Sequence, residues 1–302
     1  MDEQQRKEVI YISYDGMTDP LGQSQVLPYL SGLSSMGYSF HLISFEKEEK
    51  FQKFKDTIEV ICRKANIKWY PLQYTKKPPV LSTIYDVYRM HRLANQIASN
   101  HKIDLVHCRS YISALVGLSF KQKGRAKFIF DMRGFWADER VEGNIWNLNI
   151  PLYKWVYQYF KKKEIQYFSQ ADYTISLTYH GRDEIHTWKN ISGNPIPMQV
   201  IPCCVDLDKF SKPSGTADLS KINQWKKEGK FILGYVGSIG TWYMLDEMLD
   251  FFKTMLQRKD TAFVFITQEQ ALVTETCKKK GIDLSNIYTT ACLHHQVPDY
   301  VQ

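Results

Sequence analysis

The sequence has no segment that marks a secreted or membrane-spanning protein. Its longest apolar stretches fall short of the roughly 18 residues that a membrane-spanning helix needs, and the polar residues 2–7 lead directly into a strand-like segment. The six cysteines include no Cys-x-x-Cys pair, so we expect reduced thiols rather than a disulfide framework. These absences predict a cytoplasmic protein without a signal peptide.

Excess charge is also scarce. The 39 lysines and arginines outnumber the 32 aspartates and glutamates, giving a formal net charge of +7. The positive charge is dispersed, apart from two lysine runs at residues 161–163 and 278–280. Such a balance argues against a nucleic-acid partner and suits an anionic substrate, or peripheral contact with an anionic membrane on the cytoplasmic side.

Several cofactor and nucleophile motifs are missing. The chain has no G-x-G-x-x-G turn, no P-loop and no G-x-S-x-G nucleophile elbow. His180 and His186 lie six residues apart, off one helical face, and His294 and His295 are adjacent, so neither pair has the spacing of metal ligands. The sequence therefore predicts no metal and no bound cofactor.

What the sequence does contain is an alternation of short apolar strands and longer amphipathic stretches, which is typical of α/β domains with parallel sheets. Hydrophobic residues make up 44% of the chain and charged residues 24%, as in ordinary globular proteins. In the first series we expect strands at residues 9–14, 39–45, 67–72, 103–107, 127–131, 173–177 and 199–202, and helices at residues 23–36, 82–98, 111–121, 151–168 and 179–188.

A second, shorter series follows. It holds expected strands at residues 231–236, 262–267 and 286–289, with helices at residues 245–257 and 269–280. We therefore expect an N-terminal domain at residues 1–205, a linker rich in Ser, Lys, Gly and Pro at residues 206–229, and a partial C-terminal domain at residues 230–302. Sheets usually hold about five or six strands, so the second domain is expected to be incomplete and the chain to be C-terminally truncated.

Two glycine-containing turns each join a predicted strand to a predicted helix. A helix that begins after such a turn offers free N–H groups and a positive dipole end to an anion. Gly22 and Gln23 lie in the first turn, and the second turn could cradle a diphosphate. The alternative for each is a plain turn without a ligand. The residues singled out in the second turn are Gly237, Ser238, Gly240 and Thr241.

Polar side chains also follow two strands of the first series. His107 and Arg109 come at the end of one strand, where open α/β sheets bind ligands, and an arginine binds anions in a bidentate way. The next strand leads into carboxylates and aromatic rings that could hold a sugar or act as a general base. The alternatives are a buried histidine bonded to the backbone and a surface salt-bridge network. The residues of the second group are Asp131, Arg133, Trp136, Asp138, Glu139 and Arg140.

The predicted helix at residues 151–168 carries apolar residues at helical spacing together with lysines. A helix lying on a membrane surface shows this pattern, but a surface helix packed on a core shows it too and is the more common case. The residues concerned are Leu152, Trp155, Val156, Tyr159, Lys154 and Lys161 to Lys163.

These turns, in this order, resemble the glycosyltransferase family 4 enzymes of the GT-B fold. The most specific segments are residues 11–16 with 19–25, residues 131–139, and residues 201–206, which look like the family's passage into its second domain. The resemblance implies two Rossmann-like domains that face a cleft. It also implies transfer of a sugar from a nucleotide-sugar donor to an acceptor, with retention of configuration and without a catalytic metal.

The resemblance also implies roles for individual residues. It gives a catalytic role to His107, Asp131 and Glu139, with His107 near the scissile bond of the donor. It assigns the donor and its phosphates to Gly22, Gln23, Gly237, Ser238, Gly240 and Thr241. It assigns the acceptor to Asp15, Arg109, Arg133, Trp136 and Asp138.

Two departures from the family pattern leave alternatives open. The family commonly has an Arg where this chain has Ser238, and a Lys where it has Trp242 or Tyr243. The family's paired-glutamate motif would come after Tyr300. We expect a hexosyltransferase-type enzyme that builds a polysaccharide or cell-surface glycan on a glycan or lipid-linked acceptor. The alternatives are a non-catalytic acceptor-binding fragment and a GT-B epimerase or phosphorylase.

Overall fold

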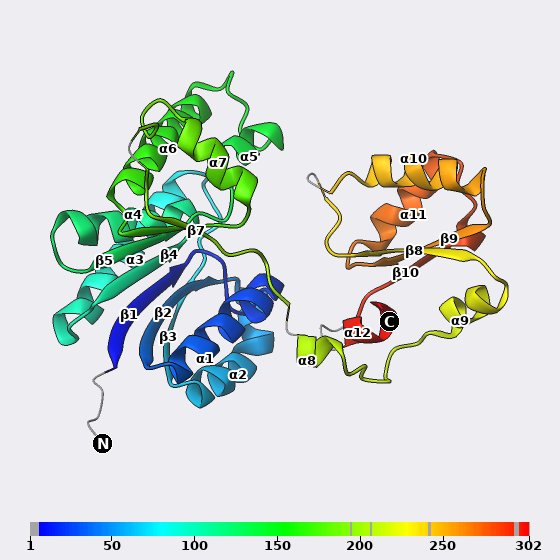
Figure 1. Ribbon diagram of the computed structural model, residues 1–302, viewed down its shortest axis with the longest axis horizontal. Coiled ribbons are helices and arrows are strands. Elements are labelled where there is room, and N and C mark those ends of the chain that lie inside the picture. The colour runs from blue at the N-terminus through cyan, green and yellow to red at the C-terminus, as the bar shows by residue number, and fades with distance from the viewer. Residues whose placement is uncertain (1–5, 194, 206, 241–242, 293–295, 302) are drawn as a thin grey trace. The chain divides into compact units, whose positions relative to one another are not determined.

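The computed structural model describes residues 6–193, 195–205, 207–240, 243–292 and 296–301, with only the backbone of Lys209. The chain forms two compact units, Met1–Cys204 and Val205–Gln302, and Figure 1 shows a sheet in each. None of the described helices is long and apolar enough to cross a membrane.

The first unit is built on a seven-stranded parallel sheet (Figure 1). Its strand order is β3-β2-β1-β4-β5-β6-β7. Because β4 pairs with β1 rather than with β3, the chain builds outward in one direction from β1 and in the other from β4. The boundary between them is the topological switch point at which α/β sheets bind ligands. The strands are β1 (Lys7–Ser13), β2 (Tyr38–Glu46), β3 (Ile67–Gln73), β4 (Leu105–Arg109), β5 (Lys127–Asp131), β6 (Tyr173–Ser176) and β7 (Met198–Val200).

Helices cover both faces of this sheet. Along β1, Tyr11 packs in one apolar core with α1 and α2, while Ile10 and Ile12 pack in another with α3, α4 and α6. Alternate residues of a strand face opposite sides, so this pattern buries β1 on both faces. The helical elements are η1 (Gly22–Val26), α1 (Leu27–Ser35), α2 (Glu48–Lys64), α3 (Leu81–Asn100), α4 (Ser110–Gln122), α5 (Trp136–Glu142), α6 (Pro151–Gln170) and α7 (Tyr179–Thr187).

The second unit has a three-stranded parallel sheet in the order β10-β9-β8. Leu249 and Phe252 of α10 and Val273 of α11 pack in one core, and Trp225 of α9 packs in another. Its elements are α8 (Leu207–Phe210), α9 (Ser220–Lys227), β8 (Phe231–Val236), α10 (Leu245–Leu256), β9 (Thr261–Ile266), α11 (Gln270–Lys279), η2 (Leu284–Asn286), β10 (Ile287–Thr290) and α12 (Val297–Val301).

Every strand expected from the sequence is present, with each end within two residues of its expected position. The expected helix at residues 23–36 is instead a π-helical turn, η1, followed by α1, which has Pro28 at its first turn. Helices α2, α5, α8 and α9 were not predicted as helices, whereas α12 lies where residues 296–300 were expected to open a helix. Residues 206–229, predicted to be a linker, contain α8 and α9, and Trp225 is buried against Ala262 and Val264 of β9.

Candidate functional site

Three of the predicted site residues lie side by side at the carboxyl ends of β4 and β5. In the strand register, Arg109 stands opposite Ser13 on one side and Asp131 on the other, and His107 stands opposite Tyr11. β4 is the neighbour of β1 at the switch point, and β5 is the next strand along the sheet. The topology therefore brings His107, Arg109 and Asp131 to the edge where ligands bind in such sheets.

Arg133 and Gln25 complete this group, which we call the polar cluster: Gln25, His107, Arg109, Asp131 and Arg133. The Gln25 side-chain oxygen accepts hydrogen bonds from Arg109 at 3.0 Å and from Arg133 at 2.8 Å. The Asp131 carboxylate lies 3.9 Å from Arg109, 3.8 Å from Arg133 and 3.9 Å from His107 Nε2. Two cations therefore share one carboxylate and one amide.

Several buried polar atoms of the cluster have no hydrogen-bond partner. His107, Arg109 and Asp131 are all buried, yet His107 Nε2, Arg109 Nε and Asp131 Oδ1 have none. A buried polar group without a partner is costly to the fold, about 1–3 kcal/mol. A ligand that reaches this edge of the sheet can supply the partners that these three atoms lack.

Two tyrosines surround His107. The Tyr11 ring centroid lies 4.6 Å from the imidazole and the Tyr29 centroid lies 6.3 Å from it. Burial, with the nearby Asp131 carboxylate, raises the pKa of both phenols above their usual value. Both phenols therefore stay protonated at neutral pH. Neither tyrosine was predicted as a site residue, although Tyr11 lies in the segment 11–16 that carries the family resemblance and pairs with His107 in the sheet.

The loop between β1 and η1 is shaped by one buried carboxylate. Glu46, at the end of β2, accepts hydrogen bonds from the backbone N–H groups of Met17 and Thr18 at 2.8 and 3.1 Å, and from the hydroxyls of Thr18 and Ser44. These bonds attach the loop to the end of β2. The role of Glu46 could not be predicted from the sequence, because a charged residue at the end of a strand is common and does not by itself indicate a function.

Gly22 is buried, and its own loop occupies the space beside it. A Cβ there would lie 2.3 Å from the Gly16 carbonyl oxygen and 2.6 Å from the Met17 Cα. Close packing of the loop on η1 thus explains the glycine. The Gln23 side chain donates to the Thr18 carbonyl at 3.1 Å, which directs it toward the loop. Asp15 lies 3.7 Å from Arg109 Nε and is half-exposed.

The three predicted site residues of α5 belong to another environment. Asp138 accepts hydrogen bonds from Tyr157 and Lys161 of α6, each at 2.8 Å. The Trp136 ring packs against Tyr111, Trp146 and Phe160. The Glu139 carboxylate lies against the Cα of Gly134, and desolvation raises its pKa. The structure therefore records no contact of Trp136, Asp138 or Glu139 with the polar cluster.

The glycine turn of the second unit follows β8. Gly237 has a φ of +151°, which only glycine adopts readily, and a Cβ at Gly240 would meet open space. The Ser238 carbonyl accepts a hydrogen bond from Tyr235 at 2.7 Å, and Glu269 accepts one from the N–H of Ile239 at 3.2 Å. Thr241, also predicted in this turn, and Trp242 lie outside the described residues.

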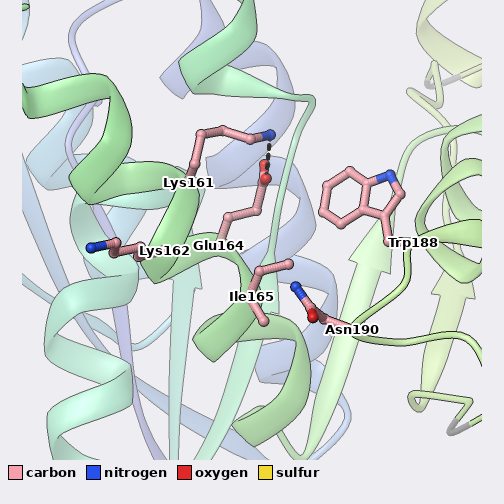
Figure 2. A pocket seen from close by; sticks show the side chains of 6 residues that line it. All are labelled: Lys161, Lys162, Glu164, Ile165, Trp188 and Asn190. Carbon is pink, nitrogen blue, oxygen red and sulfur yellow. Dashed lines mark ion pairs between the residues drawn. The ribbon is translucent and has the colours of Figure 1, made fainter. Parts of the chain in front are cut away.

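A pocket of about 400 Å³ lies between α6 and the segment after α7. In Figure 2, Lys161 and Glu164 face Trp188 and Asn190 across it. The other lining residues are Lys162 and Ile165. No member of the polar cluster lines this pocket, so it is separate from the candidate site.

One trio of described side chains could hold a metal ion. Glu8, His41 and His101 place their ligand atoms within 4.8 Å of one another. His41 is already bonded through both ring nitrogens, to Glu8 at 2.9 Å and to the Tyr70 hydroxyl at 3.1 Å. Glu8 begins β1 and His101 precedes β4, so the trio lies at the opposite edge of the sheet from the polar cluster. It needs no ion to satisfy its hydrogen bonds.

The fold is shared with solved structures of GT-B proteins, which confirms the fold class expected from the sequence. A sucrose-phosphate synthase from Thermosynechococcus elongatus aligns with a TM-score of 0.68 at 13% identity, over 97% of this chain and 72% of that one. A glycosyltransferase from Rickettsia africae aligns with a TM-score of 0.59 at 12% identity, over 98% and 70%. A UDP-N-acetylglucosamine 2-epimerase from Rickettsia bellii aligns with a TM-score of 0.53 at 13% identity, over 98% and 71%.

The comparison with curated proteins finds no match. The comparison with family models finds one, the family described as Glycosyltransferase Family 4, over residues 24–209. That range covers more than half of the chain and includes every member of the polar cluster. The chain belongs to Glycosyltransferase Family 4.

Proposed function

We propose that the protein transfers a sugar from a nucleotide-sugar donor to a glycan or lipid-linked acceptor, with retention of configuration, in polysaccharide or cell-surface glycan synthesis. The observation that carries the proposal is the polar cluster at the switch point. Its buried and partly unpaired atoms form a preorganised polar surface in the part of the chain that matches the family. Such a surface stabilises developing charge without reorganising during the reaction.

Arg109 and Arg133 give the site the positive charge that a phosphorylated substrate needs. Their guanidinium groups share Gln25 as a common acceptor, so they converge on one place. A guanidinium binds phosphate oxygens in a bidentate way. This charge would offset the absence of the family's usual Arg and Lys near Ser238, and it would neutralise the leaving diphosphate without a metal.

We propose a same-face substitution for the transfer step. The bond between the anomeric carbon and the diphosphate oxygen breaks, and the acceptor oxygen bonds to that carbon on the same face. The acceptor's hydroxyl proton passes to the leaving phosphate oxygen. His107 and Asp131 would bind the sugar hydroxyls near the anomeric carbon, and the protonated phenols of Tyr11 and Tyr29 would limit water around them.

A lipid-linked acceptor calls for contact with a membrane, and the sequence of α6 is compatible either with a membrane-surface helix or with a helix packed on the core. In the structure Val156 and Phe160 are buried in the core, while Leu152 and Trp155 are exposed. Lys161 binds Asp138 and Glu164, whereas Lys154 and Lys162 are exposed. Peripheral attachment of a cytoplasmic enzyme to the inner membrane face therefore remains part of the proposal.

The experiment that tests the proposed function is calorimetric titration of the full chain with UDP and with GDP. Micromolar binding of one nucleotide, about −8 kcal/mol, is the expected result. Sugar conjugates of that nucleotide are then assayed for nucleotide release with and without acceptors. Absence of binding to both nucleotides would contradict the proposal and favour an acceptor-binding module. Turnover of the nucleotide-sugar without any acceptor would instead favour an epimerase.

A further inference from the structure

The first two turns of α3 carry an apolar stripe that nothing in the described first unit covers. Leu81, Ile84, Tyr85 and Tyr88 are 63%, 56%, 54% and 60% exposed. Their spacing is i, i+3, i+4 and i+7, which places them on one face of the helix. A contiguous exposed apolar patch of this kind marks an interaction surface.

The exposed charged residues of segment 74–92, which contains the stripe, are all basic. Exposed Lys76 and Lys77 precede the helix and exposed Arg92 follows one turn after Tyr88. Between residues 74 and 92 the one acidic residue is Asp86. Asp86 is buried and accepts hydrogen bonds from Tyr14 and from the hydroxyl and N–H of Thr75. The exposed residues of segment 74–92 therefore offer apolar groups and cations and no carboxylate.

The stripe lies at the same edge of the sheet as the polar cluster. β3 ends at Gln73 and α3 begins at Leu81, while the next strand starts only at Leu105. In a parallel sheet a helix that follows a strand begins at the strand's carboxyl edge and runs back along the sheet. Farther along α3 the same face becomes polar, with Arg92, Gln96 and Ser99 exposed. Apolar exposure is thus confined to the end of α3 near the site.

We propose that this surface, which we call the α3 tip (Lys76, Lys77, Leu81, Ile84, Tyr85 and Tyr88), docks the protein on an anionic lipid bilayer. The apolar side chains enter the interface, where tyrosine rings sit at headgroup level, and the lysines contact the anionic headgroups. A second copy of the chain fits less well. An isologous contact would bring like charges together, because the tip has no exposed acid to pair with its lysines.

The inference rests on the proposed function in one respect, since a lipid-linked acceptor would reach the polar cluster across this edge of the sheet. It also adds to that function. It assigns the main membrane contact to α3, which was predicted from the sequence as a helix at residues 82–98 without any membrane role.

The test is sedimentation of the full chain with phosphatidylcholine vesicles, with and without phosphatidylglycerol. We expect binding only to the anionic vesicles, weakened by added salt because exposed charges are screened. A variant with Leu81→Ser, Ile84→Ser, Tyr85→Ser and Tyr88→Ser should lose at least about tenfold in vesicle partitioning, and Lys76→Glu with Lys77→Glu should lose a similar factor.

The matched control is Met36→Ser with Val60→Ser, two apolar residues that are 74% and 45% exposed and belong to the α1 and α2 side of the sheet. It should bind vesicles like the wild type. Equal binding by the α3-tip variants and the wild type, or wild-type binding that ignores lipid charge, would overturn the proposal. So would a wild-type dimer that the α3-tip variants convert to monomers, because the occupant would then be a second copy.

The two proposals fail separately. Nucleotide binding without vesicle binding would remove the α3 docking surface and leave the proposed transferase. Vesicle binding without nucleotide binding would remove the proposed transferase and leave the α3 docking surface.

Discussion

At the scale of single residues, Gln25 links the two arginines of the candidate site. It lies in η1, a π-helical turn, and such turns are frequent at functional sites. Its one carbonyl oxygen holds two guanidinium groups that come from the ends of two different strands. The distance between the two cations is therefore fixed by a side chain that need not touch substrate.

Replacing Gln25 should change the geometry of the candidate site without unfolding the protein. Gln25→Met keeps the side-chain volume but removes the acceptor, so Arg109 and Arg133 lose their common anchor. We expect kcat/KM for sugar transfer to fall at least about tenfold, since small displacements at a site cost rate steeply. Gln25→Glu, which keeps the acceptor oxygen, should retain more activity.

Ser24→Ala is the control on the same turn, because the Ser24 hydroxyl bonds only to the Pro20 carbonyl at 2.8 Å. Thermal unfolding checks that all three variants stay folded. Equal activity of Gln25→Met and the wild type would show that Gln25 does not position the arginines.

Sequence patterns located some of these residues and not others, for a physical reason. His107, Arg109 and Asp131 could be predicted together because strand ends in a parallel sheet meet at one edge. The contacts of Gln25 depend on a side-chain rotamer, which no spacing encodes. Asp138 was predicted together with these residues. It lies in α5, which begins after Phe135, and its carboxylate bonds to Lys161 of α6 instead.

At the scale of elements, α5 and α6 are tied by an ion network in which Lys161 is central. Its Nζ lies 2.8 Å from Asp138 and 2.5 Å from Glu164. Burial raises the pKa of Glu164, which also accepts a hydrogen bond from Tyr111. Burial alone would lower the pKa of Lys161, but its two carboxylate partners raise it.

Removing Lys161 should therefore destabilise the first unit. Lys161→Met leaves the buried Glu164 carboxylate without its cation, and we expect a loss of about 2 kcal/mol in the free energy of unfolding. Lys162→Met, one position along the same helix and exposed, should change it by less than about 0.5 kcal/mol. Urea unfolding of both variants measures the difference. Equal stability of the two would contradict the role given to the network.

In the second unit, Asp299 links two segments of the chain through hydrogen bonds. It accepts hydrogen bonds from the Ser214 hydroxyl at 2.7 Å and from the N–H groups of Gly215, Thr216 and Ala217 at 3.0 to 3.1 Å. These bonds lower its pKa from 3.8 to about 2. They attach the segment before α9 to α12.

The lowered pKa sets the direction of an acid effect. The folded state holds the Asp299 proton more weakly than the unfolded state does. Its contribution to stability is therefore complete above the unfolded pKa of 3.8 and is lost as the pH falls through about 2. Asp299→Asn should be less stable than the wild type at neutral pH, and the gap should shrink as acid is added. Urea unfolding across that range tests this, with the exposed Asp208→Asn as the control that should follow the wild type.

Strands were easier to predict than helices in this chain. The strands of both sheets are short apolar runs with clear ends, such as residues 261–266, which are buried throughout. Helix α2 is rich in charge and buries only Ile58 and Cys62, so it looked like a polar connection. Helix α9 is only eight residues long and buries two residues, Ile222 and Trp225, so its apolar pattern is too short to stand out in the Lys- and Ser-rich segment around it.

At the scale of the whole molecule, each unit has an apolar core of its own. The cores of the first unit contain Leu30 on one face of the sheet and Ile12 on the other, and those of the second contain Leu249 and Trp225. Units with separate cores commonly unfold as separate cooperative transitions.

Scanning calorimetry should resolve two transitions that mutations move one at a time. Leu249→Ala, at a fully buried position in the second unit, should destabilise its transition by about 3 kcal/mol and leave the other in place. Leu30→Ala, equally buried in α1, should do the opposite. A single transition that both variants shift would show that the two units unfold together.

The strand order has a consequence for how the chain is made. β1 lies between β2 and β4 in the finished sheet, yet β4 begins only at Leu105, almost a hundred residues later. While the ribosome is still adding those residues, one edge of an apolar strand has no partner. Unpaired apolar edges are where nascent chains aggregate or recruit chaperones. The switch point that forms the candidate site is therefore also the last junction of the first half of the sheet to close during synthesis.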